Sequence, residues 1–181
     1  RTQPGLLDLT RNNANALVHT AVQTVANNAR QAVYEQNSDV IQAFSWFSAM
    51  DSKVCPQCMA LCGREWKNDK GNTPIGHSVP FQLPPIHFND RCVLLPVTKT
   101  FKQLGLDLPK LPPGERASSL GPISADTTFD QYLQRVPKTQ QNEMLGKGRA
   151  DLFREGKISL NQLLDGQGRE LTLKELQQKY N

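Results

Sequence analysis

The sequence contains no hydrophobic run long enough to cross a membrane. None of its apolar stretches approaches the roughly 20 consecutive residues that a spanning helix needs. No short apolar stretch follows a basic start, as it does in a secretory signal. We therefore expect an intracellular protein without a membrane contact. A hydrophobic fraction of 38% and a mean hydropathy of -0.52 indicate a chain that can bury a core while carrying much polar surface.

Strong charge of one sign is also missing. The formal net charge is +4 and the sequence pI is about 8.9, well short of proteins that bind nucleic acid by neutralising many phosphates. Non-specific contact with DNA is compatible with this composition but is not required by it.

Familiar catalytic motifs are absent as well. The sequence has no phosphate-binding Walker loop, no nucleophile elbow and no His-Glu-x-x-His helix. These absences exclude the enzyme classes that the motifs define, and no small-molecule substrate is indicated. We predict a structural protein without catalytic activity.

Three regular elements are predicted in the first hundred residues. Between residues 12 and 34, apolar residues recur every three or four positions, which predicts one amphipathic helix packed against neighbours. Residues 40–48 partly alternate and include three aromatics, which favours a strand. The apolar run 92–97 predicts a buried strand that returns beside the first. Between them, residues 67–85 contain two glycines and four prolines, which predicts an irregular loop.

The rest of the chain is predicted as a linker followed by short helices. Proline-rich residues 104–127 indicate a semi-extended linker, or a strap lying on another surface. The leucines of the last third are expected to form a small core of their own. Helix ends and capping boxes, in which a hydroxyl and a later side chain satisfy each other's backbone donors, mark the helices. The predicted helices are 129–136, 140–145 and 149–154, with further starts marked by Ser159 with Gln162 and by Thr172 with Glu175.

Together these patterns predict an α+β fold. It comprises a long N-terminal helix, a small β element held by cysteine and histidine, and a C-terminal module of short helices. The predicted divisions are residues 1–103, the linker or strap 104–127, and the helical module 128–181.

Cysteine is scarce, and its distribution is uneven. Cys55, Cys58 and Cys62 lie within eight residues, and the fourth cysteine is Cys92. The two-residue gap between Cys55 and Cys58 lets both thiolates face one ion, and His87 and Cys92 complete a tetrahedral set of four donors. Zinc is redox-silent and accepts sulfur and nitrogen ligands in this geometry. We therefore predict a structural zinc site formed by Cys55, Cys58, His87 and Cys92.

Other interpretations of these residues remain open. Cys62 is a substitute ligand, and His77 competes with His87 for the imidazole position. The cysteines can also be small buried hydrophobic residues, or a redox pair, although the alternating βαβ pattern of thioredoxin-like proteins is absent. A metal-dependent nuclease using His87 and Asp90 is a further alternative, but further histidines or carboxylates for a catalytic ion are not evident.

Three segments carry a more specific signal: Trp46 to Cys58, Leu61 to Trp66, and Pro84 to Cys92. They resemble the Mu F-like minor head proteins of tailed bacteriophages, also called the phage head morphogenesis family. At one point the chain departs from the pattern, because Asp90 stands where members commonly have the first cysteine of His-x-x-Cys-Arg-Cys. Further segments similar to the family are the helix end 28–34 and the stretches 129–133, 145–150, 153–158 and 171–176.

The resemblance implies a structural minor head protein of the virion, present in few copies at the portal vertex. It implies binding to the portal protein or the major capsid protein, and a role in head morphogenesis and in DNA packaging or delivery. It implies no catalysis, and it implies that the protein passes through the host cytoplasm during assembly.

Overall fold

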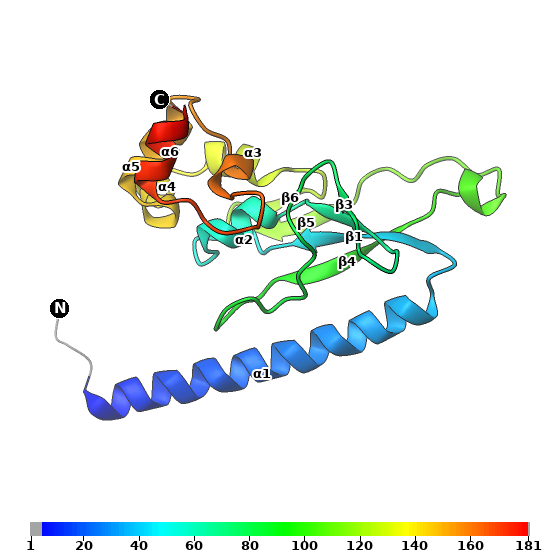
Figure 1. Ribbon diagram of the computed structural model, residues 1–181, viewed down its shortest axis with the longest axis horizontal. Helices are drawn as coiled ribbons and strands as arrows, with labels where there is room; N and C mark the ends of the chain where they lie inside the picture. Colours follow the sequence, from blue (N-terminus) through cyan, green and yellow to red (C-terminus); the bar gives the residue numbers. More distant parts are fainter. Residues whose placement is uncertain (1–4, 181) are drawn as a thin grey trace.

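The computed structural model describes residues 5–180 and has an α+β fold, as predicted (Figure 1). A long helix lies along one side of a small antiparallel sheet, and the short C-terminal helices lie together on the other side of the sheet from this helix (Figure 1). No helix of the described chain combines the length and the apolar character needed to cross a bilayer. The helices are α1 (Leu6–Gln36), α2 (Pro56–Leu61), α3 (Phe129–Arg135), α4 (Lys138–Leu145), α5 (Lys147–Arg154) and α6 (Leu173–Tyr180), with 3-10 helices η1 (Lys102–Leu104) and η2 (Leu160–Leu163). The strands are β1 (Ile41–Phe47), β2 (Glu65–Lys67), β3 (Pro74–Ile75), β4 (Val93–Thr98), β5 (Glu115–Ser118) and β6 (Gly121–Ser124).

The main sheet has the strand order β3-β2-β1-β4. As predicted, β4 returns beside β1, and the two pair antiparallel with Trp46 opposite Leu94. Phe44 and Trp46 are buried side chains of β1, which explains the aromatic-rich strand pattern. The loop 67–85 was predicted to be irregular, but it contains the two-residue strand β3, which pairs Pro74 with Trp66. A proline and a pairing of only two residues leave too little pattern for a sequence prediction.

The first helix is longer than predicted and faces the sheet with its polar side. On β4, the edge strand, the carbonyl of Leu94 accepts a hydrogen bond from the Tyr34 hydroxyl (3.2 Å), and just before the strand the Cys92 carbonyl accepts one from the Gln23 amide (3.0 Å). Asn27 is buried and donates to the Pro84 carbonyl (3.0 Å). Because unpaired strand edges invite pairing with other chains, these polar side chains protect the edge of the sheet. The helix is therefore packed against a neighbour, as predicted, but through its polar side.

The segment 104–127 contains more regular structure than a linker. After an exposed stretch without secondary structure at 106–114, β5 and β6 form a hairpin. The hairpin lies against β1, because the Arg116 guanidinium stacks 3.9 Å above the centre of the Phe47 ring. The hairpin part of the segment therefore packs on the main sheet. The hairpin was missed because Pro122 and the polar residues of β5 obscure any strand alternation.

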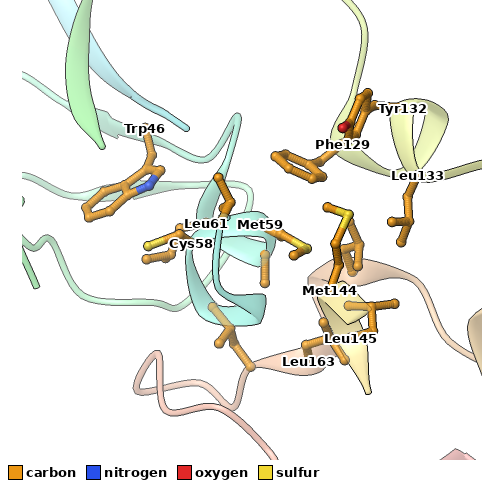
Figure 2. Close-up of a cluster of buried hydrophobic side chains, with 14 of the residues drawn as sticks. Trp46, Cys58, Met59, Leu61, Phe129, Tyr132, Leu133, Met144, Leu145 and Leu163 are labelled. Carbon is orange, nitrogen blue, oxygen red and sulfur yellow. The ribbon is translucent and has the colours of Figure 1, made fainter. Parts of the chain in front are cut away.

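The short helices begin and end close to the predicted positions. Both predicted capping interactions are present: the capping box of Ser159 and Gln162 at η2, and the hydrogen bonds between Thr172 and Glu175 at α6. The buried side chains, however, do not form a core of their own. Met59 and Leu61 of α2 share one hydrophobic cluster with Leu163 and the residues of α3 and α4 (Figure 2). The core therefore continues from the sheet into the C-terminal helices.

Candidate metal centre

Two of the predicted ligands are placed by the start of α2. Cys55 is the N-cap residue of this helix, and Pro56 follows at the first helical position, where its missing N–H costs nothing. The backbone N–H of Cys58 points at the Cys55 Sγ atom (3.4 Å). The tight first turn therefore turns both thiols to the same side.

The other two predicted ligands come from the chain that leads into β4. The Nε2 atom of His87 lies 3.2 Å from the Cys55 Sγ atom and 3.3 Å from the Cys58 Sγ atom. Tetrahedral zinc with bonds of ordinary length would place such sulfur and nitrogen atoms about 3.6 Å apart. Both sulfur–nitrogen distances are within a few tenths of an ångström of this value.

Cys58 also belongs to a second group of potential ligands. Its Sγ atom, a carboxylate oxygen of Asp90 and the Sγ atom of Cys92 lie within 4.8 Å of one another, and all three residues are buried. The structure therefore places the four predicted ligands in two groups that share Cys58, and it adds Asp90 to the second group. We call Cys55, Cys58, His87, Asp90 and Cys92 the Cys/His cluster.

Asp90 organises the loop that carries His87 and Cys92. Only 3% of this residue is exposed. One carboxylate oxygen accepts the backbone N–H of Cys92 (2.8 Å), and the other accepts that of Ile86 (2.9 Å). The sequence suggested Asp90 only as a nuclease residue and as a departure from the family pattern. Its position two residues before Cys92 is the one sequence signal that could have indicated this role.

The imidazole of His87 is oriented for ligation. Its Nδ1 atom lies 2.9 Å from the Phe88 carbonyl oxygen, which can only accept, so Nδ1 carries the proton and Nε2 presents its lone pair to the cysteines. Burial alone would lower the pKa of His87, but the hydrogen bond to Phe88 and the negative charges of Cys55 and Asp90 raise it overall. The raised pKa favours a second proton, on Nε2. A cation that binds at Nε2 would have to displace this proton.

The two thiols of α2 differ in acidity. A hydrogen bond from Cys58, together with the positive charge of His87, lowers the pKa of Cys55 to about 6 against the effect of burial. The neighbouring Cys55 and Cys92 sulfurs and burial raise the pKa of Cys58. The Cys55 thiolate thus suppresses ionisation of the Cys58 thiol. A bound cation would remove this conflict, because it stabilises all the thiolates at once.

Ser48 contacts two residues of the cluster, and sequence reasoning missed it. Its buried hydroxyl donates to the Cys58 carbonyl (2.8 Å) and lies 3.3 Å from the Cys92 Sγ atom. The indole N–H of Trp46 in turn donates to the Ser48 hydroxyl oxygen (3.1 Å). The end of β1 is thereby joined to both cysteines.

The two substitute ligands lie elsewhere. Cys62 follows the last residue of α2 and belongs to neither ligand group of the described chain. His77 accepts the backbone N–H of Val79 at Nδ1 and donates from Nε2 to the Glu65 carbonyl (3.0 Å), while its ring packs edge-on against Trp66. Both ring nitrogens of His77 are therefore engaged away from the cluster.

The donor set fits a structural zinc ion. Three thiols and an imidazole are the ligands that zinc prefers, and a buried carboxylate can complete or support the shell. The cavity among these side chains measures about 20 Å³, which is enough for one ion but not for a substrate. His87 faces two sulfurs, and Asp90 accepts two backbone N–H groups, so both residues are oriented toward the cluster and its loop.

Replacing Asp90 by asparagine distinguishes a loop organiser from an essential ligand. The asparagine amide has one oxygen, so one of the two backbone N–H groups loses its acceptor, and we expect a loss of about 1–3 kcal/mol in the free energy of unfolding. Metal content, measured by elemental analysis, should remain that of the unmodified protein. Loss of the metal from Asp90→Asn would instead make Asp90 an indispensable ligand.

The fold is that of an α+β protein in which residues of α2 and of the loop before β4 form a cysteine- and histidine-rich cluster that could bind a metal. Comparison with protein families adds a specific match: residues 4–95 match the family described as Phage Mu protein F like protein. The chain belongs to this family, and it is thereby a phage head morphogenesis protein. Comparisons with curated proteins and with solved structures gave no match. The matched region ends within β4, so it includes α1 and all five residues of the Cys/His cluster.

Proposed function

We propose that the protein is a structural minor component of a tailed-phage head. It occupies the portal vertex in few copies and acts in head assembly and in DNA packaging or delivery. Family membership over residues 4–95 carries this proposal. The portal protein is the proposed main partner, and the major capsid protein is the second.

The Cys/His cluster has a structural role in this proposal. A zinc ion held by Cys55, Cys58, His87 and Cys92 would join the start of α2 to the loop before β4, two segments about thirty residues apart. The cysteine and histidine donors of the two groups, with Ser48 bonded to Cys58 and adjacent to Cys92, support a site filled by protein ligands and therefore closed. A closed site has no open coordination position for a substrate, which supports a structural function over a catalytic one.

The mild positive charge is compatible with a position close to packaged DNA. A net charge of +4 over 181 residues gives weak, salt-sensitive contact with phosphates and no sequence preference. We propose that DNA contact, where it occurs, is secondary to protein contact.

The copy number of the chain in purified phage particles tests the proposed position at the portal vertex. Quantitative mass spectrometry of the virion should find the chain in a number of copies comparable to the portal protein and far below the major capsid protein. Copies comparable to the major capsid protein, or absence from assembled heads, would contradict a position at the portal vertex. The purified chain should bind purified portal protein in a pull-down in which major capsid protein serves as the comparison.

A cleavage assay tests the structural role separately. Plasmid incubated with the purified chain and magnesium should remain supercoiled. Cleavage that disappears in His87→Ala but persists in the matched variant His77→Ala would support the nuclease instead.

A further inference from the structure

The long helix α1 presents its apolar side to solvent. Polar residues face the sheet, whereas every apolar position on the opposite side is exposed. Val22 and Val25 are 63% and 69% exposed, and none of these residues joins the hydrophobic cluster of the described chain. The exposed set, which we call the apolar stripe, comprises Leu7, Ala14, Val18, Ala21, Val22, Val25, Ala29, Ala32 and Val33.

The stripe has the spacing of a helix-packing surface. Its residues follow one another at intervals of mostly three, four or seven, as in helices that pack lengthwise. The run from Leu7 to Val33 is about 40 Å long, and two helices in contact over that length bury on the order of 800 Å² per copy, the size of a standard interface. All residues of the stripe are exposed, and the sheet lies along one side of α1 (Figure 1).

We propose that the stripe binds the stripe of a second copy of this chain, with the two α1 helices antiparallel. An alignment centred on Thr20 places Val18 of one copy opposite Val22 of the other and Leu7 opposite Val33, so apolar residues meet apolar residues at both ends and in the middle. The pattern of α1 is thus complementary to itself under a two-fold axis, which is the commonest symmetry of homodimers.

The charges of α1 are compatible with the same arrangement, in which Asp8 also keeps its ion pair with Arg11 of its own chain (3.2 Å). The helix carries two acids, Asp8 and Glu35, and two arginines, Arg11 and Arg30, so two copies do not repel each other. Asp8 and Arg30 lie on the same side of the stripe on a helical wheel of 3.6 residues per turn. The antiparallel alignment brings Asp8 of one copy within about two residues of Arg30 of the other, twice by symmetry. A parallel pair would instead place Arg11, which lies within the stripe, opposite Arg11.

The dimer also leaves room for the rest of each molecule, because both stripes lie between the two sheets. In each copy the sheet lies on the outer side of α1, so the order across the dimer is sheet, helix, helix, sheet. The Cys/His cluster stays within each copy and contributes nothing to the contact. The proposal therefore goes beyond the proposed role in the phage head and does not depend on it.

Sedimentation equilibrium of the purified, metal-replete chain tests the dimer. We expect the mass to rise with concentration to twice the 20.2 kDa of one chain. Val22→Glu should weaken the dimer at least about 10-fold, because it places a charge in the middle of the buried stripe. Asn13→Glu adds the same charge to an exposed position outside the stripe and should dimerise like the unmodified protein.

A charge exchange tests the antiparallel register. Asp8→Lys should weaken the dimer, and combining it with Arg30→Glu should restore it, since the two positions meet only in the antiparallel pair. Far-UV circular dichroism confirms that each variant keeps its helix. A chain that remains at 20.2 kDa up to about 0.2 mM, or a Val22→Glu variant that dimerises normally, overturns the proposal, and so does failure of the exchange to restore the dimer. A stripe that binds only another head protein would give the first of these results.

Discussion

Cys58→Ser is expected to lose the bound metal and most of the protein's stability. Cys58 is the residue shared by both ligand groups, and its Sγ atom lies 3.3 Å from the His87 Nε2 atom. Zinc binding contributes about 10–16 kcal/mol in zinc-finger peptides, which is comparable to the whole free energy of unfolding of a typical domain, about 5–15 kcal/mol. Elemental analysis should show a fall from about one zinc ion per chain to near zero, and the melting temperature should fall by more than about 10 °C.

Cys62→Ser is the matched control for that experiment. Cys62 lies four residues further along the chain, just beyond α2, and belongs to neither ligand group of the described chain. The same replacement of sulfur by oxygen should leave the zinc content unchanged there. Equal zinc loss in both variants would show that Cys62 takes part in binding, and retention of zinc in Cys58→Ser would contradict the proposed centre.

Leu163→Ala is expected to destabilise the sheet as well as the C-terminal helices. Leu163 lies in η2 with 0% exposure, in the same cluster as Met59 and Leu61 (Figure 2). Truncating a buried leucine leaves a cavity and costs about 2–5 kcal/mol, so the melting temperature should fall by roughly 5–15 °C. Both tryptophans, Trp46 and Trp66, lie in the sheet, so their fluorescence reports unfolding of the other half of the molecule.

The comparison for this variant is Leu111→Ala. Leu111 is 70% exposed in the stretch without secondary structure, and its truncation should change the free energy of unfolding by less than about 0.5 kcal/mol. If the tryptophan transition of Leu163→Ala coincides with that of the unmodified protein, the C-terminal helices unfold independently. That result would support residues 128–181 as a separate module, the division that the sequence predicts.

The elements that sequence reasoning found have strong local signals. The paired strands around Trp46 and Leu94 show as apolar and aromatic runs, and the capping boxes at Ser159 and Thr172 show as hydroxyl residues at a fixed spacing from an acceptor. Spacing and donor type restrict metal sites severely, so the sequence could indicate residues that the structure places in two groups around Cys58. These features depend on residues close together in the chain, or on chemistry that few residue types provide.

The features that were missed depend on distant contacts. Nothing local shows that Gln23 and Tyr34 meet the carbonyls of Cys92 and Leu94, so the sheet-facing side of α1 could not be inferred from hydrophobicity. Asp90 was overlooked as a loop organiser because its partners are backbone N–H groups, for which its position two residues before Cys92 is the only sequence signal. The contact between Arg116 and Phe47, almost seventy residues apart, fixes the β5–β6 hairpin in the same way.

The polar side of α1 has a consequence for how this protein can take part in assembly. By engaging the carbonyls of Cys92 and Leu94, the helix removes the β4 edge of the sheet from the surfaces on which another chain could add strands without limit. The surface that α1 exposes to solvent is the apolar stripe, which has a finite length and can be covered by a single partner. The same helix thus permits self-limiting association through its exposed side and hinders open-ended association through the strand edge. This matters for any protein that is packed closely with other proteins in a particle.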